Sequence, residues 1–169
     1  MSGREPLRAS FNSRSMARYY EELKPKTMLA MAGPDHLIST RTGLQNKGFH
    51  QSIHLSGRAL RDIVDWPASE ADGYDFKDFN TVVNACHYKS LVDMAKIAGA
   101  LDKLDDVKFY QERAAKVMAA INARMFDSGR GIYVDGIGSS HASLHANLFP
   151  LAFGIVPEAH RKSVVEFVK

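Results

Sequence analysis

Two consecutive segments with a helical period constrain the fold more than any other feature of this 169-residue chain. In the segment 106–126 the apolar side chains fall three or four residues apart, which places them on one face of an α-helix. The segment 80–101 has the same spacing, and only the short link 102–105 separates the two. The sequence therefore predicts an antiparallel helical hairpin.

Three further helices are predicted around this hairpin, so the expected fold class is all-α, built from antiparallel helical hairpins. A helix over 16–31 would be capped by Ser13 or Ser15, although Pro25 removes one backbone donor inside it. Gly129 begins a tight turn into a short extended piece, 132–134, and a glycine- and serine-rich loop then leads to a helix over 140–152. The last helix begins at Pro157, a residue favoured in the first helical turn.

Composition excludes several classes of protein. The chain is 45% hydrophobic and 24% charged, as is usual for globular domains. Its net charge of +3 is spread along the chain, which gives no support for nucleic-acid binding. No run approaches the roughly 18 apolar residues of a membrane span. The polar leader over residues 1–14 does not resemble a secretory signal, so we expect a cytoplasmic protein. The lone Cys86 excludes an internal disulfide and is expected to be a buried thiol.

The segment 34–79 shows no sustained period and is too long for a simple connection. It contains Asp65 and Trp66, followed by several carboxylates, Glu70, Asp72, Asp75 and Asp78. Glycoside hydrolysis needs two carboxylates across the scissile bond, and aromatic rings can stack on sugar faces. The alternative, which composition alone favours, is a solvated acidic loop with one buried anchor tryptophan.

His141 and His145 are spaced to share one face of the predicted helix. We expect no zinc site there, because no glutamate follows His141 and no third ligand is evident. Hydrogen bonding to a ligand or to the neighbouring loop is the expected role of both imidazoles. Nearby serines, Ser139, Ser140 and Ser143, are expected to cap the helix. We expect neither a metal nor a cofactor.

The helical hairpin alone also suggests a tetratricopeptide-like solenoid. The run LDDVKFYQERAAKV has a suitable composition. No second copy occurs at a fixed period, so a solenoid is disfavoured.

Four runs together carry a family resemblance: DIVDWP, DGYDFKDFNTVVNACHYKSLVDMAKIAGAL, FYQERAAKV and GIYVDGIGSSHASLHANLFPLAFGIVPEAHR. In these runs the chain resembles the six-hairpin catalytic domain of bacterial α-L-rhamnosidases, over a partial domain spanning 15–169. The resemblance implies part of an (α/α)6 toroid. It also implies inverting hydrolysis of terminal α-L-rhamnose by a general acid and a general base, with carboxyls about 6.5–9.5 Å apart.

The resemblance implies substrate-binding residues but no catalytic ones. The pair Asp65 and Trp66 resembles the family's sugar-contacting tryptophan motif. Inner-face positions near the pocket would be Tyr133, Asp135, His141 and His145. The general acid of the family lies upstream of the matched region and the general base in a later hairpin, and neither motif occurs here. Glu70 and Asp72 remain candidates.

Twelve helices require about twice this length, so we expect the middle portion of such a domain. The sequence stops on an apolar helical stripe, Val164, Val165, Phe167 and Val168. The isolated chain is therefore expected to be inactive and to self-associate through exposed helical faces. The alternative is a standalone helical module that binds carbohydrate or peptide without catalysis.

Overall fold

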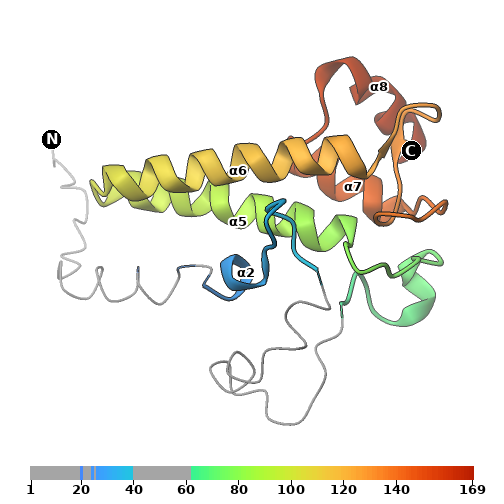
Figure 1. Ribbon diagram of the computed structural model, residues 1–169. Helices are drawn as coiled ribbons and strands as arrows, with labels where there is room; N and C mark the ends of the chain where they lie inside the picture. Colours follow the sequence, from blue (N-terminus) through green and yellow to red (C-terminus); the bar gives the residue numbers. More distant parts are fainter. Residues whose placement is uncertain (1–19, 21–23, 25, 40–61) are drawn as a thin grey trace, which may run out of the picture.

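The computed structural model describes residues 20, 24, 26–39 and 62–169, which form helices and one small antiparallel sheet (Figure 1). The all-α expectation is confirmed, with a two-stranded ribbon as the one addition in the described part of the chain. The elements are α2 (Lys26–Met31), the 3₁₀-helix η1 (Ala68–Ala71), α5 (Thr81–Ala100), α6 (Leu104–Arg124), β1 (Phe126–Asp127), β2 (Ile132–Tyr133), α7 (Leu144–Phe153) and α8 (Glu158–Phe167).

Helices α5 and α6 form the expected antiparallel hairpin and lie side by side along their length (Figure 1). Asn80 caps α5 by accepting a hydrogen bond from the backbone N–H of Val83 at 3.2 Å. Helix α6 begins two residues earlier than predicted, with Asp105 and Asp106 in its first turn, where carboxylates favour the helix dipole. The facing side chains form the main core, chiefly Leu91, Met94, Ala95, Ala98, Tyr110, Ala114, Val117 and Ile121.

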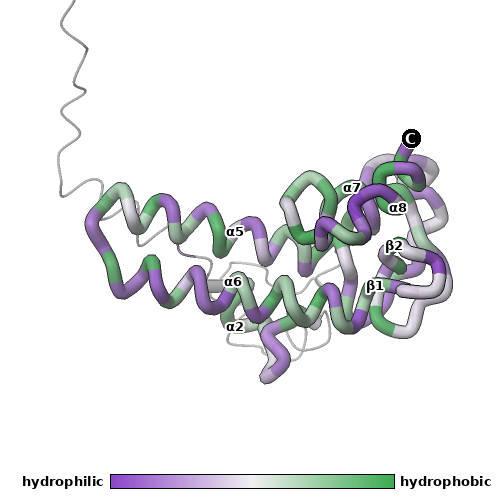
Figure 2. Tube along the Cα trace, turned by 90° about the horizontal axis from the view of Figure 1, so that it is seen from above, coloured by the Kyte–Doolittle hydropathy of each residue, from purple (hydrophilic) through white to green (hydrophobic). Residues whose placement is uncertain are grey.

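A second pair of helices, α7 and α8, packs on one end of this hairpin. Helix α7 contacts α5, and α8 contacts both α7 and β2. Seen from above, these helices and the two strands gather at the same end of the long hairpin (Figure 2). Gly154, in the left-handed conformation with φ of 74°, ends α7 and turns the chain towards α8. Helix α8 begins at Glu158, one residue later than predicted, and Pro157 is its N-cap residue.

Helix α7 begins at Leu144, which corrects the prediction of a helix from residue 140. Ser143 is the helix cap: its hydroxyl accepts from the N–H of Ala146 at 3.0 Å. The preceding residues 140–143 are held in a non-helical loop by contacts with distant side chains, described below. Within the predicted helix 16–31, the described residues include α2 and Tyr20, which is also helical. The 1–14 leader, Ser13, Ser15 and Pro25 lie outside the described residues.

Cys86 is half-buried on α5 rather than fully buried, and burial raises the pKa of its thiol, which favours the protonated form. No helix in the described residues is long and apolar enough to cross a bilayer.

Position 136 requires glycine because the backbone there lies very close to the backbone of residues 79 and 80. Gly136 forms an isolated antiparallel bridge with Asn80, and a Cβ at this position would lie 2.4 Å from the carbonyl oxygen of Phe79. Gly99, in contrast, lies exposed on α5, where an added Cβ would make only ordinary contact with Val107 at 3.8 Å.

We therefore predict opposite effects of alanine at these two glycines. Gly136→Ala should lower the free energy of unfolding by about 3 kcal/mol, because the backbone must move to relieve the clash. Gly99→Ala should raise it by about 0.5–1 kcal/mol, because alanine restricts the unfolded chain. Urea unfolding of the two variants measures both changes, and equal effects would contradict the backbone contact at Gly136.

Candidate functional site

Polar side chains gather where the loop 62–79, the loop 134–143 and the first turn of α7 meet. In Figure 1 these are the green segment that precedes α5 and the orange segment that precedes α7, at the same end of the hairpin. Four of the six predicted site residues lie in this cluster as two aspartate–histidine pairs, Asp135 with His141 and Asp65 with His145.

The buried carboxylate of Asp135 joins three segments of chain. One of its oxygens accepts from the N–H of Ser143 at 2.8 Å, which fixes the approach to α7. The other accepts from the N–H of Asp75 at 2.8 Å and lies 2.6 Å from Nδ1 of His141. Because a carboxylate only accepts, the ionised Asp135 requires a proton on Nδ1 of His141. Asp135 is therefore fully buried and holds these three segments together.

The backbone around Asp135 is fastened to the start of α5. Its carbonyl oxygen accepts from the N–H of Thr81 at 2.8 Å and lies 2.6 Å from the hydroxyl of Tyr74. Next along the loop, the N–H of Ile137 donates to the carbonyl of Phe79 at 3.1 Å. The loop 134–138 thus has a position set by the hairpin.

Asp65 and His145 brace the loop that presents Trp66. The carboxylate of Asp65 lies 3.0 Å from Nε2 of His145 and accepts from the N–H of Trp66 at 2.7 Å. These two hydrogen bonds, the one with His145 first, lower the pKa of Asp65. Further along the same loop, Asp72 accepts from the N–H of Leu144 at 2.7 Å. Two separate contacts therefore hold the loop against the first turn of α7.

The side chain of Trp66 is turned outwards, with 79% of the residue exposed. A buried anchor tryptophan, the alternative that composition favoured, is therefore wrong. The neighbouring carboxylates are also more than a solvated acidic loop, since Asp65, Asp72 and Asp75 each accept a backbone or side-chain hydrogen bond. Tryptophan side chains are usually largely buried, so an indole that is exposed on a loop held by hydrogen bonds is unusual.

Tyr133 lies apart from this cluster, in the core. It is fully buried and its hydroxyl donates to Asn122. Asn147 holds its backbone from α7: the side-chain amide accepts from the N–H of Tyr133 at 2.8 Å and donates to its carbonyl at 2.9 Å. Asn147 thus takes the place of a strand neighbour for β2.

The two histidines do not share a helix face, which corrects the prediction from their spacing. His141 precedes α7, and only His145 lies in it. The reason is long-range: Asp135 binds both His141 and the N–H of Ser143, which keeps residues 141–143 out of the helix. Within the described residues, no three His, Cys, Asp or Glu side chains are grouped as a metal site would need.

Asp62 is a residue of this cluster that the sequence reasoning missed. It is partly buried, and burial raises the pKa of its carboxyl despite a hydrogen bond from Nδ2 of Asn80 at 3.3 Å. The sequence offered one indication of its role, its position three residues before Asp65. Glu70, in contrast, is exposed on η1 and lies beside Ser69.

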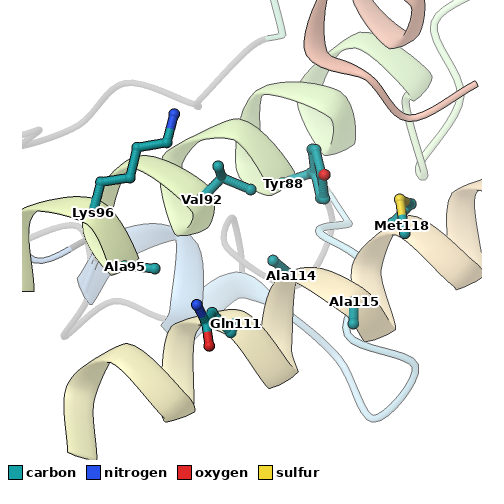
Figure 3. Close-up of a pocket in the computed structure, with 8 residues that line it drawn as sticks. All are labelled: Tyr88, Val92, Ala95, Lys96, Gln111, Ala114, Ala115 and Met118. Atoms are coloured by element: carbon teal, nitrogen blue, oxygen red, sulfur yellow. The ribbon is translucent and has the colours of Figure 1, made fainter. Parts of the chain in front are cut away.

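A cavity of about 340 Å³ lies elsewhere, between α5 and α6. Figure 3 shows its lining of mainly apolar side chains, together with the polar Lys96 and Gln111. Its lining contains no carboxylate, so it lacks the pair of carboxyl groups that glycoside hydrolysis needs.

A family model described as the bacterial α-L-rhamnosidase six-hairpin glycosidase domain matches residues 37–168. The chain belongs to this family. A solved structure of a GH78-family rhamnosidase from Bacillus sp. GL1 is similar, with a TM-score of 0.69 and 18% sequence identity. The match covers 92% of this chain and 15% of the solved one. A search of curated proteins found no match.

This rhamnosidase-family chain therefore spans a small share of its structural relative. The polar cluster lies within the residues that the family model matches.

In this rhamnosidase-family domain, we predict that Asp135→Asn lowers the free energy of unfolding by about 3 kcal/mol. The amide would direct an N–H group at N–H donors that now meet a buried carboxylate. Asp93→Asn, which removes a half-exposed ion pair with Lys89, is the control and should cost less than about 1 kcal/mol. Urea unfolding gives both values, and a loss at Asp135 no larger than the control would contradict its central role.

Proposed function

We propose that this chain is part of an α-L-rhamnosidase and that Trp66 forms one face of its sugar-binding pocket. The observation that carries the proposal is the exposed indole on a loop braced by Asp65 and His145. A rigid loop keeps an exposed aromatic ring ready for a ligand without a large entropy cost on binding.

The chemistry around Trp66 suits a deoxysugar. Rhamnose presents C–H groups and a methyl group on one side, which can pack on an indole face, and hydroxyls on the other. Asp65 and His141 keep part of their side chains exposed and supply hydrogen-bond acceptors and donors for hydroxyls. Asp135 and His145 are buried and hydrogen-bonded to the loops, so their proposed role is to position Asp65 and His141 rather than to contact the sugar.

This segment is proposed to contribute binding rather than proton transfer. A general acid needs a raised pKa, whereas hydrogen bonds lower the pKa values of Asp65 and Asp75. Asp62 has a raised pKa, but it is partly buried against Asn80. Inverting hydrolysis would then depend on carboxylates outside this cluster, and the isolated chain would be inactive.

The same exposed indole also supports the second candidate, a helical module that binds carbohydrate without catalysis. The lowered pKa values of Asp65 and Asp75 favour it, since neither carboxyl is suited to donate a proton at neutral pH. Hydrolysis of an aryl α-L-rhamnoside by the complete polypeptide that carries this segment separates the two: turnover supports the enzyme, and binding without turnover supports the module.

Two expectations from the sequence stay predictions. The exposed apolar side chains on α6 and α8, Leu104, Phe109 and Phe167, are available for self-association. The cytoplasmic location also stays a prediction.

We predict that Trp66→Ala weakens L-rhamnose binding at least about tenfold, equivalent to about 1.4 kcal/mol, because the stacking surface is lost. Trp66 is the only tryptophan in the chain, so its fluorescence in the unmodified protein reports binding directly. Calorimetric titration compares the variants.

The matched control is Phe109→Ala, which removes an exposed aromatic ring from α6. It should leave the affinity for L-rhamnose unchanged. Equal affinities for the two variants would refute the assignment of Trp66 to the pocket.

A further inference from the structure

The tight turn 33–38, which follows α2, lies against the α5–α6 hairpin (Figure 1). The N–H of Gly33 donates to the carbonyl of Leu37 at 3.0 Å, and the N–H of His36 donates to the carbonyl of Gly33 at 2.9 Å. His36 takes a left-handed conformation with φ of 66°. Leu37 is fully buried, so the turn is a packed part of the structure.

Three side-chain contacts fasten this turn to the hairpin. Asn84 of α5 accepts from the N–H of Ile38 at 2.7 Å and donates to its carbonyl at 3.0 Å. Asp35 forms an ion pair with Arg124 of α6. The third contact joins His36 to Arg113 of α6, with 2.6 Å between Nδ1 and Nη1.

The third contact allows only one protonation state of the imidazole. A guanidinium group donates hydrogen bonds and never accepts them. Nδ1 of His36 must therefore be the acceptor, and the ring must be the neutral tautomer with its proton on Nε2. A proton on Nδ1 would replace this hydrogen bond by two opposed N–H groups and two like charges.

The surroundings of His36 disfavour its protonated form. Burial lowers its pKa most, followed by the positive charges of Arg113 and Lys116 on α6. Asp35 acts in the opposite direction, but it is paired with Arg124.

His87 adds a second imidazole from α5. It is fully buried, and neither ring nitrogen has a hydrogen-bond partner in the described structure. Burial lowers its pKa to about 4, with Arg113 and His36 as further causes. Nε of Arg113 is also buried and has no hydrogen-bond partner among the described residues. Among the described residues, the two imidazoles thus lie near the positive charges of Arg113 and Lys116, and a proton added to either ring would be repelled by them.

We propose that the contact between His36 and Arg113 is an acid-labile clasp, and that protonation of His36, aided by protonation of His87, releases the 33–38 turn from the hairpin. The released turn returns the imidazole of His36 to water, where it accepts a proton at its ordinary pKa, and it removes from His87 one of the groups that lower its pKa. The inference rests on these contacts alone and is independent of the sugar site.

The direction with pH follows from proton counting. Both folded pKa values lie below the ordinary histidine value of about 6.5, so the released state binds more protons. The clasp is fully stabilised above that value and is weakened as the pH falls. At pH values between the ordinary and the lowered pKa of one histidine, the equilibrium constant for release of the turn rises about tenfold for each unit by which the pH falls.

Hydrogen exchange and nitrogen chemical shifts of the full chain test the clasp. At about pH 7.5, His36 should show the tautomer with the proton on Nε2. At about pH 4.5, protection factors at Leu37 and Ile38 should fall about tenfold or more, while those in the middle of α6 stay unchanged. Unchanged protection of the turn at the lower pH would overturn the proposal.

His36→Asn is the main variant, because asparagine tolerates the left-handed conformation and its amide oxygen accepts from Arg113 without titrating. It should remove most of the acid dependence. His160→Asn, on α8, is the matched control and should retain it. Arg113→Ala should show low protection of the turn at both pH values. Full acid dependence in His36→Asn, or full protection in Arg113→Ala, would contradict the clasp.

Discussion

The buried carboxylate of Asp135 is the interaction on which the rest of the polar cluster depends. It has no charged lysine or arginine beside it among the described contacts, and its oxygens are satisfied by two backbone N–H groups and one imidazole. A carboxylate removed from water needs several donors to offset its lost hydration. Only a conformation that brings Asp75, His141 and Ser143 together supplies them, so the burial of one charge selects the arrangement of three loops.

The α5–α6 hairpin gives this cluster a firm base. Asn80 ends the loop, caps α5 and lies 2.7 Å from the hydroxyl of Tyr74, so one residue links helix and cluster. Two further asparagines replace missing strand partners: Asn147 for Tyr133 and Asn84 for Ile38. Asn84 also donates to the carbonyl of Asn80 at 2.9 Å, which connects the 33–38 turn with the start of the cluster. Polar side chains on helices thus position most of the irregular backbone.

Local patterns predicted the parts that depend on local physics. The helical period marked α5 and α6 to within about two residues, Pro157 marked the start of α8, and Ser143 was among the expected caps of α7. The predicted start of α7 was wrong because long-range hydrogen bonds to Asp135 determine where the helix begins. The spacing of residues along the sequence carries no information about those contacts. The exposure of Trp66 and the burial of Tyr133 also depend on distant partners, His145 and Asn147. Asp62 was missed because its raised pKa arises from burial in the folded chain.

The most direct test of the proposed sugar site is a crystal structure of the complete polypeptide with L-rhamnose. The proposal predicts that the sugar ring lies against the indole of Trp66, at about 4 Å, with hydroxyls near Asp65 or His141. It also predicts that the hydrogen bonds of Asp135 persist in the complex. A bound rhamnose that leaves Trp66 in solvent, or that lies in another part of the molecule, would contradict the assignment.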